Sequence, residues 1–394
     1  MGPTGTKIAT AMDSLKNKFC EKNDVASQHS EKFFKVYSLE EQIKNDIGSS
    51  LSVYLDKDDF EYQDFHFTDA FNKIVQKIKD EKPEHAIISM NVPHIRDDRF
   101  FPSFSIKTIN NFSPEVIITL IDDALSCWAR ISTRERERHE RSYFRIRDMF
   151  TWRSASILLG DIFAKTLNIN NYLVSVKHPS IMLYKLIFER EETIRVYSAF
   201  PISSTRDFPK KKKVIDEFRV KIHENFCAFD PATIDDRLLV PNRKLEKREG
   251  SFIFKKDMRW NLSEGFPMVS DDDTWDENDS LAVPTEQIEE VTTTLSSSEK
   301  SIVDKHILHR DYRMIHASHV LIACRPFFNK IPSRGVTAEI QYATQTAGRP
   351  CFLLWKEKED GKQEDSPFGG KGVILEDIDE LISNVYKGKV DYKN

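Results

Sequence analysis

At 394 residues the chain is too long for one ordinary domain, so two domains are expected. An apolar content of 39% with 27 phenylalanines is ample for buried cores, and a net charge of -5 argues against a general nucleic-acid binder. Five scattered cysteines are typical of reduced thiols rather than of disulfides or a zinc site. With no recognisable signal peptide and no apolar stretch of membrane-spanning length, we expect a cytoplasmic protein without membrane contact.

The first half of the chain alternates apolar strands with amphipathic helices. Ile8, Met12, Leu15 and Phe19 form a helical stripe, and 116–121 is the most apolar strand. In chain order we expect a helix at 7–23, strand 33–37, helix 69–80, strands 85–90 and 116–121, a helix through residue 130, helix 154–167 and strand 172–176. Strands spaced by helices of this length predict a mostly parallel sheet.

The pattern restarts near Thr193. We expect strand 194–199, helix 213–225, strand 226–230, helix 306–317, strand 320–324, helix 334–347, strand 351–355 and helix 375–386. Residues 235–300 are expected to be irregular, and the acidic stretch 271–279 to be a mobile loop. Since no internal repeat is found, the sequence predicts two different Rossmann-like, three-layer α/β domains with mostly parallel sheets. They are placed at 1–190 and 193–394, with the irregular insertion around 240–295.

One segment near the C-terminus carries the strongest chemical signal. Ser333, Gly335 and Glu339 stand at the start of an expected helix, directly after the strand 320–324. A helix N-terminus attracts phosphate, and a carboxylate one turn into the helix can attack an anomeric carbon. Asp311 is a second carboxyl upstream, and retaining glycoside chemistry uses two carboxyls about 5 Å apart. This set predicts a site that cuts the N-glycosidic bond of a nucleotide.

The same residues resemble a known family. Residues 193–356 resemble the nucleoside 2-deoxyribosyltransferase superfamily, most closely the 2′-deoxynucleoside 5′-monophosphate N-glycosidases. The matching pieces are Val196-Tyr197, Ile202, Arg206, Arg310-Asp311, strand 320–324 and the pattern Ser333-x-Gly335-Val336-x-x-Glu339. Two features depart from the family: 200–205 replaces a glycine-rich turn, and His319 replaces the acid that opens the central strand. Both departures are expected to reshape the pocket.

The resemblance implies a role for each matching residue. Glu339 would be the nucleophile that forms a glycosyl ester, and Asp311 the acid that orients the sugar and assists departure of the base. The substrate-binding residues would be Ser333 and Gly335 at the 5′-phosphate, Tyr197 beside the sugar or base, and Arg206 as a further phosphate contact. The family also implies a homodimer that needs no metal or organic cofactor.

The N-terminal domain distantly resembles a P-loop nucleoside monophosphate kinase. Its start, 2–7, evokes a Walker A loop but lacks the glycine before Lys7 and carries Ile8 where a magnesium-binding hydroxyl belongs. The arginine-rich stretch 134–138 is interpreted as a solvated, salt-bridged helix. We therefore expect a degenerate nucleotide-binding or scaffold domain.

These observations lead to one functional hypothesis and two kinds of alternative. The hypothesis is hydrolysis of the N-glycosidic bond of a nucleotide, with a 2′-deoxynucleoside 5′-monophosphate as the expected substrate, giving free base and sugar 5-phosphate. The enzymatic alternatives are NAD cleavage and deoxyribosyl transfer between bases. The alternative of another class is a non-catalytic nucleotide sensor. Histidines 306, 309, 316 and 319 are interpreted as solvated or capping rather than as metal ligands.

Overall fold

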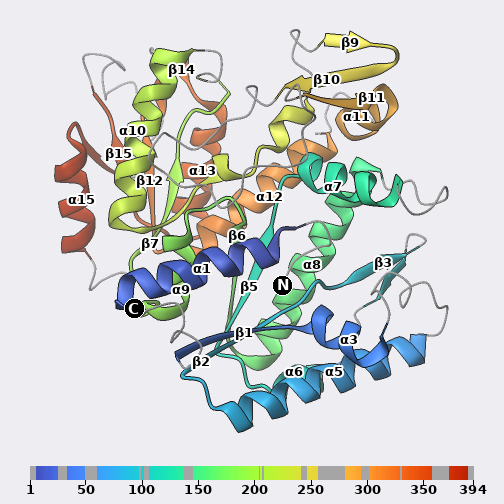
Figure 1. Cartoon of the computed structure of the whole chain (residues 1–394). Helices are drawn as coiled ribbons and strands as arrows, with labels where there is room; N and C mark the ends of the chain where they lie inside the picture. Colours follow the sequence, from blue (N-terminus) through green and yellow to red (C-terminus); the bar gives the residue numbers. More distant parts are fainter. Residues whose placement is uncertain are drawn as a thin grey trace. The chain divides into compact units, whose positions relative to one another are not determined.

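The computed structural model describes residues 6–24, 33–48, 60–96, 99–101, 106–136, 145–203, 205, 208–240, 246–255, 280–293, 301–328, 331–356 and 372–388. The chain divides into two compact units, Met1–Val176 (unit 1) and Lys177–Asn394 (unit 2). Both contain helices and mostly parallel sheets, so the expected α/β fold class is confirmed (Figure 1).

Unit 1 is built from parallel strand pairs and helices. Its strands are β1 (Phe34–Ser38), β2 (His85–Ser89), β3 (His94–Arg96), β4 (Arg99–Phe101), β5 (Val116–Ile121) and β6 (Asn170–Ser175). Its helices are α1 (Ile8–Asn23), α3 (Leu39–Ile47), α5 (Phe60–Glu81), α6 (Ile106–Asn110), α7 (Ala124–Arg136) and α8 (Ile146–Leu167). β1 pairs with β2 and β5 with β6 in parallel, whereas β3 and β4 pair antiparallel.

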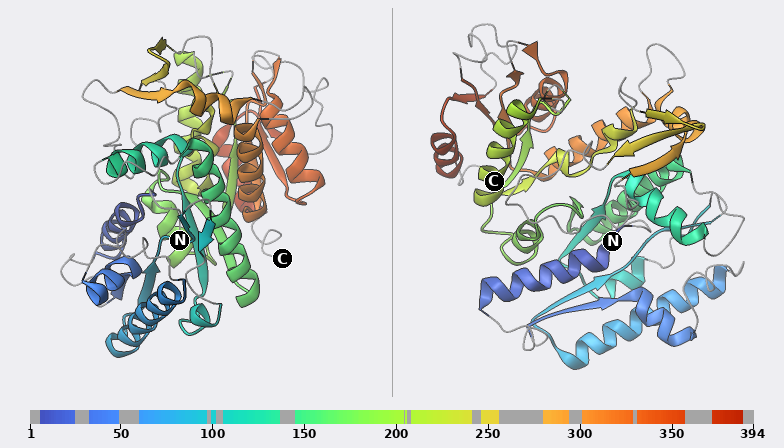
Figure 2. Two further views of the ribbon diagram at one scale, coloured as in Figure 1. Left: turned by 90° about the vertical axis from the view of Figure 1, so that its right-hand side faces the viewer. Right: turned by 45° about the horizontal axis from the view of Figure 1, so that its top comes forward.

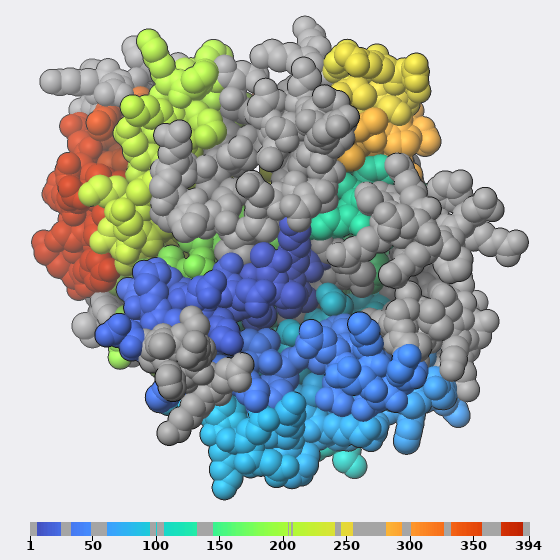
Figure 3. All heavy atoms as spheres, viewed as in Figure 1, coloured from blue at the N-terminus to red at the C-terminus, as the bar shows by residue number. Residues whose placement is uncertain are grey.

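Helices cover both faces of the β1–β2 pair (Figure 2). On one face Phe19 of α1 packs on Phe34, with ring centroids 5.5 Å apart. On the other face Tyr37 shares a core with Phe67 and Phe71 of α5. The outer side of α1 forms part of the surface seen in Figure 3. The two buried residues of β1, Phe34 and Tyr37, stand three positions apart and therefore point to opposite faces of the strand pair.

Unit 2 contains a five-stranded parallel sheet. Its strands are β7 (Arg195–Ala199), β8 (Cys227–Phe229), β12 (Val320–Cys324), β15 (Cys351–Leu354) and β16 (Val373–Leu375), in the spatial order β8-β7-β12-β15-β16. The strand order reverses between β7 and β12, and open α/β sheets bind ligands at such a switch point. Unit 2 therefore has its natural crevice between the strands that carry the sequence-predicted residues.

Helices lie on both faces of this sheet (Figure 1). They are α9 (Ser180–Phe188), α10 (Pro209–Asn225), α12 (Ile302–Ala317), α13 (Arg334–Gln345) and α15 (Ile378–Lys387), with 3-10 turns at Pro231–Thr233 and Asp236–Leu239. Val196 and Ile322 share a core with Ile222 of α10 and Leu381 of α15. The next residue of β7, Tyr197, points to the opposite face, where α12 and α13 pack. That second face holds the candidate site.

The expected domain boundary near 188–193 differs from the structure, which divides the chain between Val176 and Lys177. The cause is α9, a short and almost wholly apolar helix whose sequence shows no clear period. It packs on β8, and Lys185 donates a hydrogen bond to the carbonyl oxygen of Phe226 at 3.2 Å. Residues 177–190 therefore belong with unit 2.

The insertion around 240–295 is more regular than expected. It contains an antiparallel sheet of β9 (Glu246–Arg248), β10 (Ser251–Lys255) and β11 (Ser280–Pro284), followed by α11 (Thr285–Thr292). Phe254 and Val283, on neighbouring strands, are completely buried. The prediction of an irregular segment was therefore wrong for these ranges, while the acidic stretch 271–279 lies outside the described residues.

Two further features are plain in the described ranges. No helix there combines the length and apolar content needed to cross a bilayer. All five cysteines are buried and form no disulfide with one another.

Candidate active site

Glu339 is placed by helix α13. This helix begins after Ser333, at the edge of the sheet where β12 ends. Its buried face consists of Val336, Glu339, Ile340 and Ala343. The spacing of these residues, 3 and 4 apart, directs Glu339 to the sheet. Its side chain is only 9% exposed, although a glutamate is rarely buried unless it is paired.

One oxygen of Glu339 is bound and the other has no partner. The Tyr197 hydroxyl donates to Glu339 Oε1 at 3.0 Å, across 142 residues of sequence. Glu339 Oε2 is buried and accepts no hydrogen bond from any described group. A buried acceptor left without a donor is costly, and in native proteins such groups are frequently functional. The arrangement leaves one carboxyl oxygen available for a ligand.

Asp311 reaches the same region from α12, held by its neighbour Arg310. The guanidinium donates to Asp311 Oδ1 through Nε at 2.9 Å and lies 2.8 Å away through Nη2. Arg310 also donates to the carbonyl oxygens of Ile234 at 3.0 Å and Pro231 at 3.4 Å. Since Asp311 and Arg310 are about 95% buried, this ion pair fixes Asp311 and anchors the segment after β8.

The electrostatics of the site favour a proton on Glu339. Burial and the negative charge of Asp311 raise the pKa of Glu339 to about 8, although Tyr197 and Arg310 act in the opposite direction. Burial and the charges of Asp311 and Glu339 also raise the pKa of Tyr197 well above its usual value. At neutral pH Glu339 is therefore mostly protonated in the ligand-free site, next to the ion pair of Asp311 and Arg310.

The segment after β8 is fixed by a second buried network. Asp230 accepts from Arg219 Nε at 2.7 Å and contacts His223 Nε2 at 3.2 Å, and its own amide donates to His178 Nε2 at 3.0 Å. Burial alone would raise the pKa of Asp230, but Arg219 and His223 outweigh it and hold that pKa well below its usual range. These bonds to Asp230 fix the start of the turn at Pro231–Thr233, and the carbonyl oxygen of Pro231 in this turn accepts a hydrogen bond from Arg310.

The predicted phosphate-binding residues lie at the N-terminus of α13. Ser333 is half-buried, and its hydroxyl makes no capping bond to the helix. Gly335 is exposed, with no atom within 4 Å of the position where a Cβ would lie. Both residues therefore leave room at the amide end of the helix, as an anion site requires. Arg206 lies outside the described residues.

The substitution at His319 has a structural role away from the crevice. His319 opens β12 at the amino end of the strand, where its Nε2 receives a hydrogen bond from Arg195 Nη2 at 2.5 Å. Its backbone amide donates to the Arg195 carbonyl at 2.8 Å. His319 thus lies at the amino edge of the sheet, whereas ligands bind at the carboxyl edge of such a sheet, and its expected effect on the pocket stays a prediction.

An aromatic cluster beside the carboxyls was not anticipated. Tyr312 of α12 stacks on Tyr342 of α13, with ring centroids 3.6 Å apart and an angle of 2° between the rings. The Tyr342 hydroxyl lies 2.7 Å from His316 Nε2. The only signal in the sequence is that Tyr312 follows Asp311 directly and Tyr342 stands one helical turn after Glu339.

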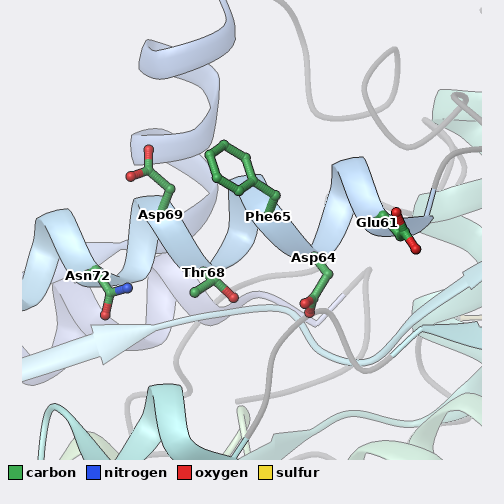
Figure 4. A pocket seen from close by; sticks show the side chains of 6 residues that line it. All are labelled: Glu61, Asp64, Phe65, Thr68, Asp69 and Asn72. Carbon is green, nitrogen blue, oxygen red and sulfur yellow. The ribbon is translucent and has the colours of Figure 1, made fainter.

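A shallow hollow of about 400 Å³ lies elsewhere, on the outer side of α5 in unit 1 (Figure 4). All six described lining residues come from this one helix: Glu61, Asp64, Phe65, Thr68, Asp69 and Asn72. They include three carboxylates and the exposed ring of Phe65. Without a buried polar group or a cationic side chain among them, this surface offers little to an anionic ligand.

In the described part of the chain, no group of three or more His, Cys, Asp or Glu side chains is arranged to hold a metal ion.

No protein-family model matches the chain, and no curated protein matches it either. The chemistry of the site is therefore argued from its own residues.

Proposed function

We propose that unit 2 hydrolyses the N-glycosidic bond of a nucleotide, with a 2′-deoxynucleoside 5′-monophosphate as the expected substrate. The observation that carries this proposal is the convergence of Tyr197, Asp311 and Glu339, which come from β7, α12 and α13. Glu339 Oε2, buried and without a partner, supplies the nucleophile. The open amide end of α13 supplies a place for the phosphate.

The reaction would proceed in two displacements. The ionised Glu339 carboxylate attacks C1′, the C1′–N bond breaks with its electron pair going to the base, and the base takes up a proton. Water then attacks C1′ of the glycosyl ester, giving sugar 5-phosphate and regenerating Glu339. The charge of Asp311 stabilises the positive charge that develops on the sugar ring, and its fixed position means that little reorganisation is needed.

The test is release of free base by the full-length protein. We would incubate it with deoxynucleoside monophosphates, ribonucleoside monophosphates, nucleosides and NAD, and separate the products by chromatography. Base release from a deoxynucleoside monophosphate should fall by at least about 10³-fold in Glu339→Gln. The matched control is Glu380→Gln, on an exposed position of α15, which should retain full activity. Full activity in Glu339→Gln would reject the mechanism.

The same assay separates the alternatives. A preference for NAD, or exchange of an added free base into the nucleotide, would assign one of the two other enzymatic activities. Nucleotide-dependent thermal stabilisation without any product would favour a sensor. For the covalent step, mass spectrometry of a rapidly quenched reaction should find a sugar phosphate on the peptide that contains Glu339.

A further inference from the structure

The Tyr312–Tyr342 stack bridges the two helices that carry the candidate carboxyls. Tyr342 stands three residues after Glu339, on the same side of α13, and Tyr312 of α12 stacks on it, so the pair lies next to Glu339. The rings are parallel within 2° at 3.6 Å. Because the Tyr342 hydroxyl is engaged with His316, the two tyrosines are not equivalent.

The Tyr312 hydroxyl is the available one. Tyr312 is half-buried, and no described residue forms a hydrogen bond with its hydroxyl. Side chains on a helix point toward its N-terminus, which for α12 lies on the carboxyl side of the sheet. The charges of Glu339 and Asp311 act on this phenol, so Tyr312 lies close to both carboxyls.

The proposed reaction lacks an evident acid. Arg310 contacts Asp311 Oδ1 twice, which stabilises the charged form of this carboxyl and makes it a poor proton donor. Glu339 has to be ionised in order to attack C1′. A base that leaves with the bonding electron pair therefore needs a donor other than these two carboxyls.

We propose that Tyr312 is a further catalytic residue, which hydrogen-bonds the departing nucleobase and gives it its proton; this inference rests on the proposed function. The O–H bond of Tyr312 breaks as the nitrogen of the base accepts the proton, and the resulting phenolate recovers a proton from water. Tyr342 holds the Tyr312 ring in place by stacking and is a positioning residue.

The charges around Tyr312 agree with a donor role. Burial and the charges of Glu339, Tyr342 and Asp311 raise the pKa of Tyr312. The phenol is therefore kept protonated at neutral pH, and the same nearby negative charge destabilises the phenolate, so reprotonation is favoured. The nucleobase becomes basic only as the glycosidic bond breaks, and a phenol that is still protonated at that moment can donate to it.

The experiment compares two leaving groups in two phenylalanine variants. Tyr312→Phe keeps the stacked ring and loses the hydroxyl, and Tyr62→Phe, at a half-buried tyrosine of α5 in unit 1, is the matched control. One substrate is the deoxynucleoside monophosphate that the wild type cleaves best. The other is 4-nitrophenyl 2-deoxyribofuranoside 5-phosphate, whose nitrophenolate leaves without needing a proton. In Tyr312→Phe, kcat/KM should fall by about 100-fold for the nucleotide and by less than about threefold for the nitrophenyl compound. Tyr62→Phe should be near the wild type with both.

Equal losses on the two substrates would overturn the inference and leave Tyr312 with a structural role. Should the wild type cleave neither substrate, the proposed function fails, and the catalytic role of Tyr312 fails with it. A second readout needs no turnover: ultraviolet titration of wild type minus Tyr312→Phe isolates this phenol. Its midpoint should lie above that of an ordinary tyrosine and fall in Glu339→Gln, and an unchanged midpoint would contradict the proximity on which the inference depends.

Discussion

Replacing Glu339 by glutamine should change how the stability of the protein depends on pH. The pKa of Glu339 is about 8 in the folded protein, against 4.5 for an ordinary glutamate. Between these values the folded state holds a proton that the unfolded state has lost, so the free energy of unfolding falls as pH rises. The slope is about 1.4 kcal/mol per pH unit and flattens near pH 8, which amounts to about 2 kcal/mol between pH 6 and pH 8. Because glutamine cannot ionise, this fall of the unfolding free energy with pH should be absent in Glu339→Gln.

The measurement is urea unfolding followed by circular dichroism at pH 6, 7 and 8. The difference in unfolding free energy between Glu339→Gln and wild type should grow with pH by about 2 kcal/mol over this range. Glu380→Gln, on the exposed side of α15, is the control and should follow the wild type. A difference that stays constant from pH 6 to pH 8 would mean that Glu339 ionises as freely as an exposed carboxyl, and would refute the raised pKa of Glu339.

Three further outcomes follow from the same reasoning. Tyr197→Phe removes the hydrogen bond that lowers the pKa of Glu339. Because Glu339 acts in its ionised form, the midpoint of the rise of kcat/KM with pH should then shift upward by about one pH unit; an unchanged midpoint would contradict this. Asp230→Asn removes the fully buried carboxylate from Arg219 Nε, although Arg219 keeps its bond to Asp216, and should lower the unfolding free energy at pH 7 by about 3 kcal/mol, measured by urea unfolding. Because the pKa of Asp230 is depressed, its stabilisation is present above about pH 4 and is lost on acidification, so the gap between wild type and Asp230→Asn should narrow below that pH. Burial lowers the pKa of His94 to about 4, so wild type should lose about 2 kcal/mol between pH 8 and pH 5 as the unfolded state takes up a proton, whereas His94→Phe should not show this contribution.

The sequence best predicted the strands and helices that are specified by their own residue pattern rather than by packing against other elements. The strands 116–121 and 320–324 were predicted to the residue, because runs dominated by valine, isoleucine and leucine suit a strand buried on both faces. Helix α10 begins at Pro209, four residues before the prediction, although proline at a first helical position is a recognised start signal. Helix α5 begins at Phe60 rather than at Asp69, because its first turns contain too few regularly spaced apolar residues to show a period.

In the candidate site, too, some residues follow from a local sequence pattern, whereas other contacts depend on the tertiary structure. Glu339 is readable because a helix start after a buried strand places a carboxylate at a known depth, whereas Asp311, well inside α12, was assigned from the pattern Arg310-Asp311. The contacts of Arg310 with the carbonyl oxygens of Pro231 and Ile234 leave no trace in the sequence, since every residue has a carbonyl. The Tyr312 stack depends on how α12 and α13 pack, and neither helix alone predicts it.

A raised pKa on the proposed nucleophile is compatible with its role. At pH 7, ionising a carboxyl whose pKa is about 8 requires about 1.4 kcal/mol, a tenfold reduction in the active fraction. The environment that imposes this cost also excludes water from Glu339, and a carboxylate in such surroundings interacts more strongly with positive charge. The positive charge on the sugar appears only as the glycosidic bond breaks, so the attraction is larger in the transition state than in the bound substrate. Burial and Asp311 thus hold Glu339 in a state that is unfavourable when the site is empty and stabilised when the sugar ring becomes cationic.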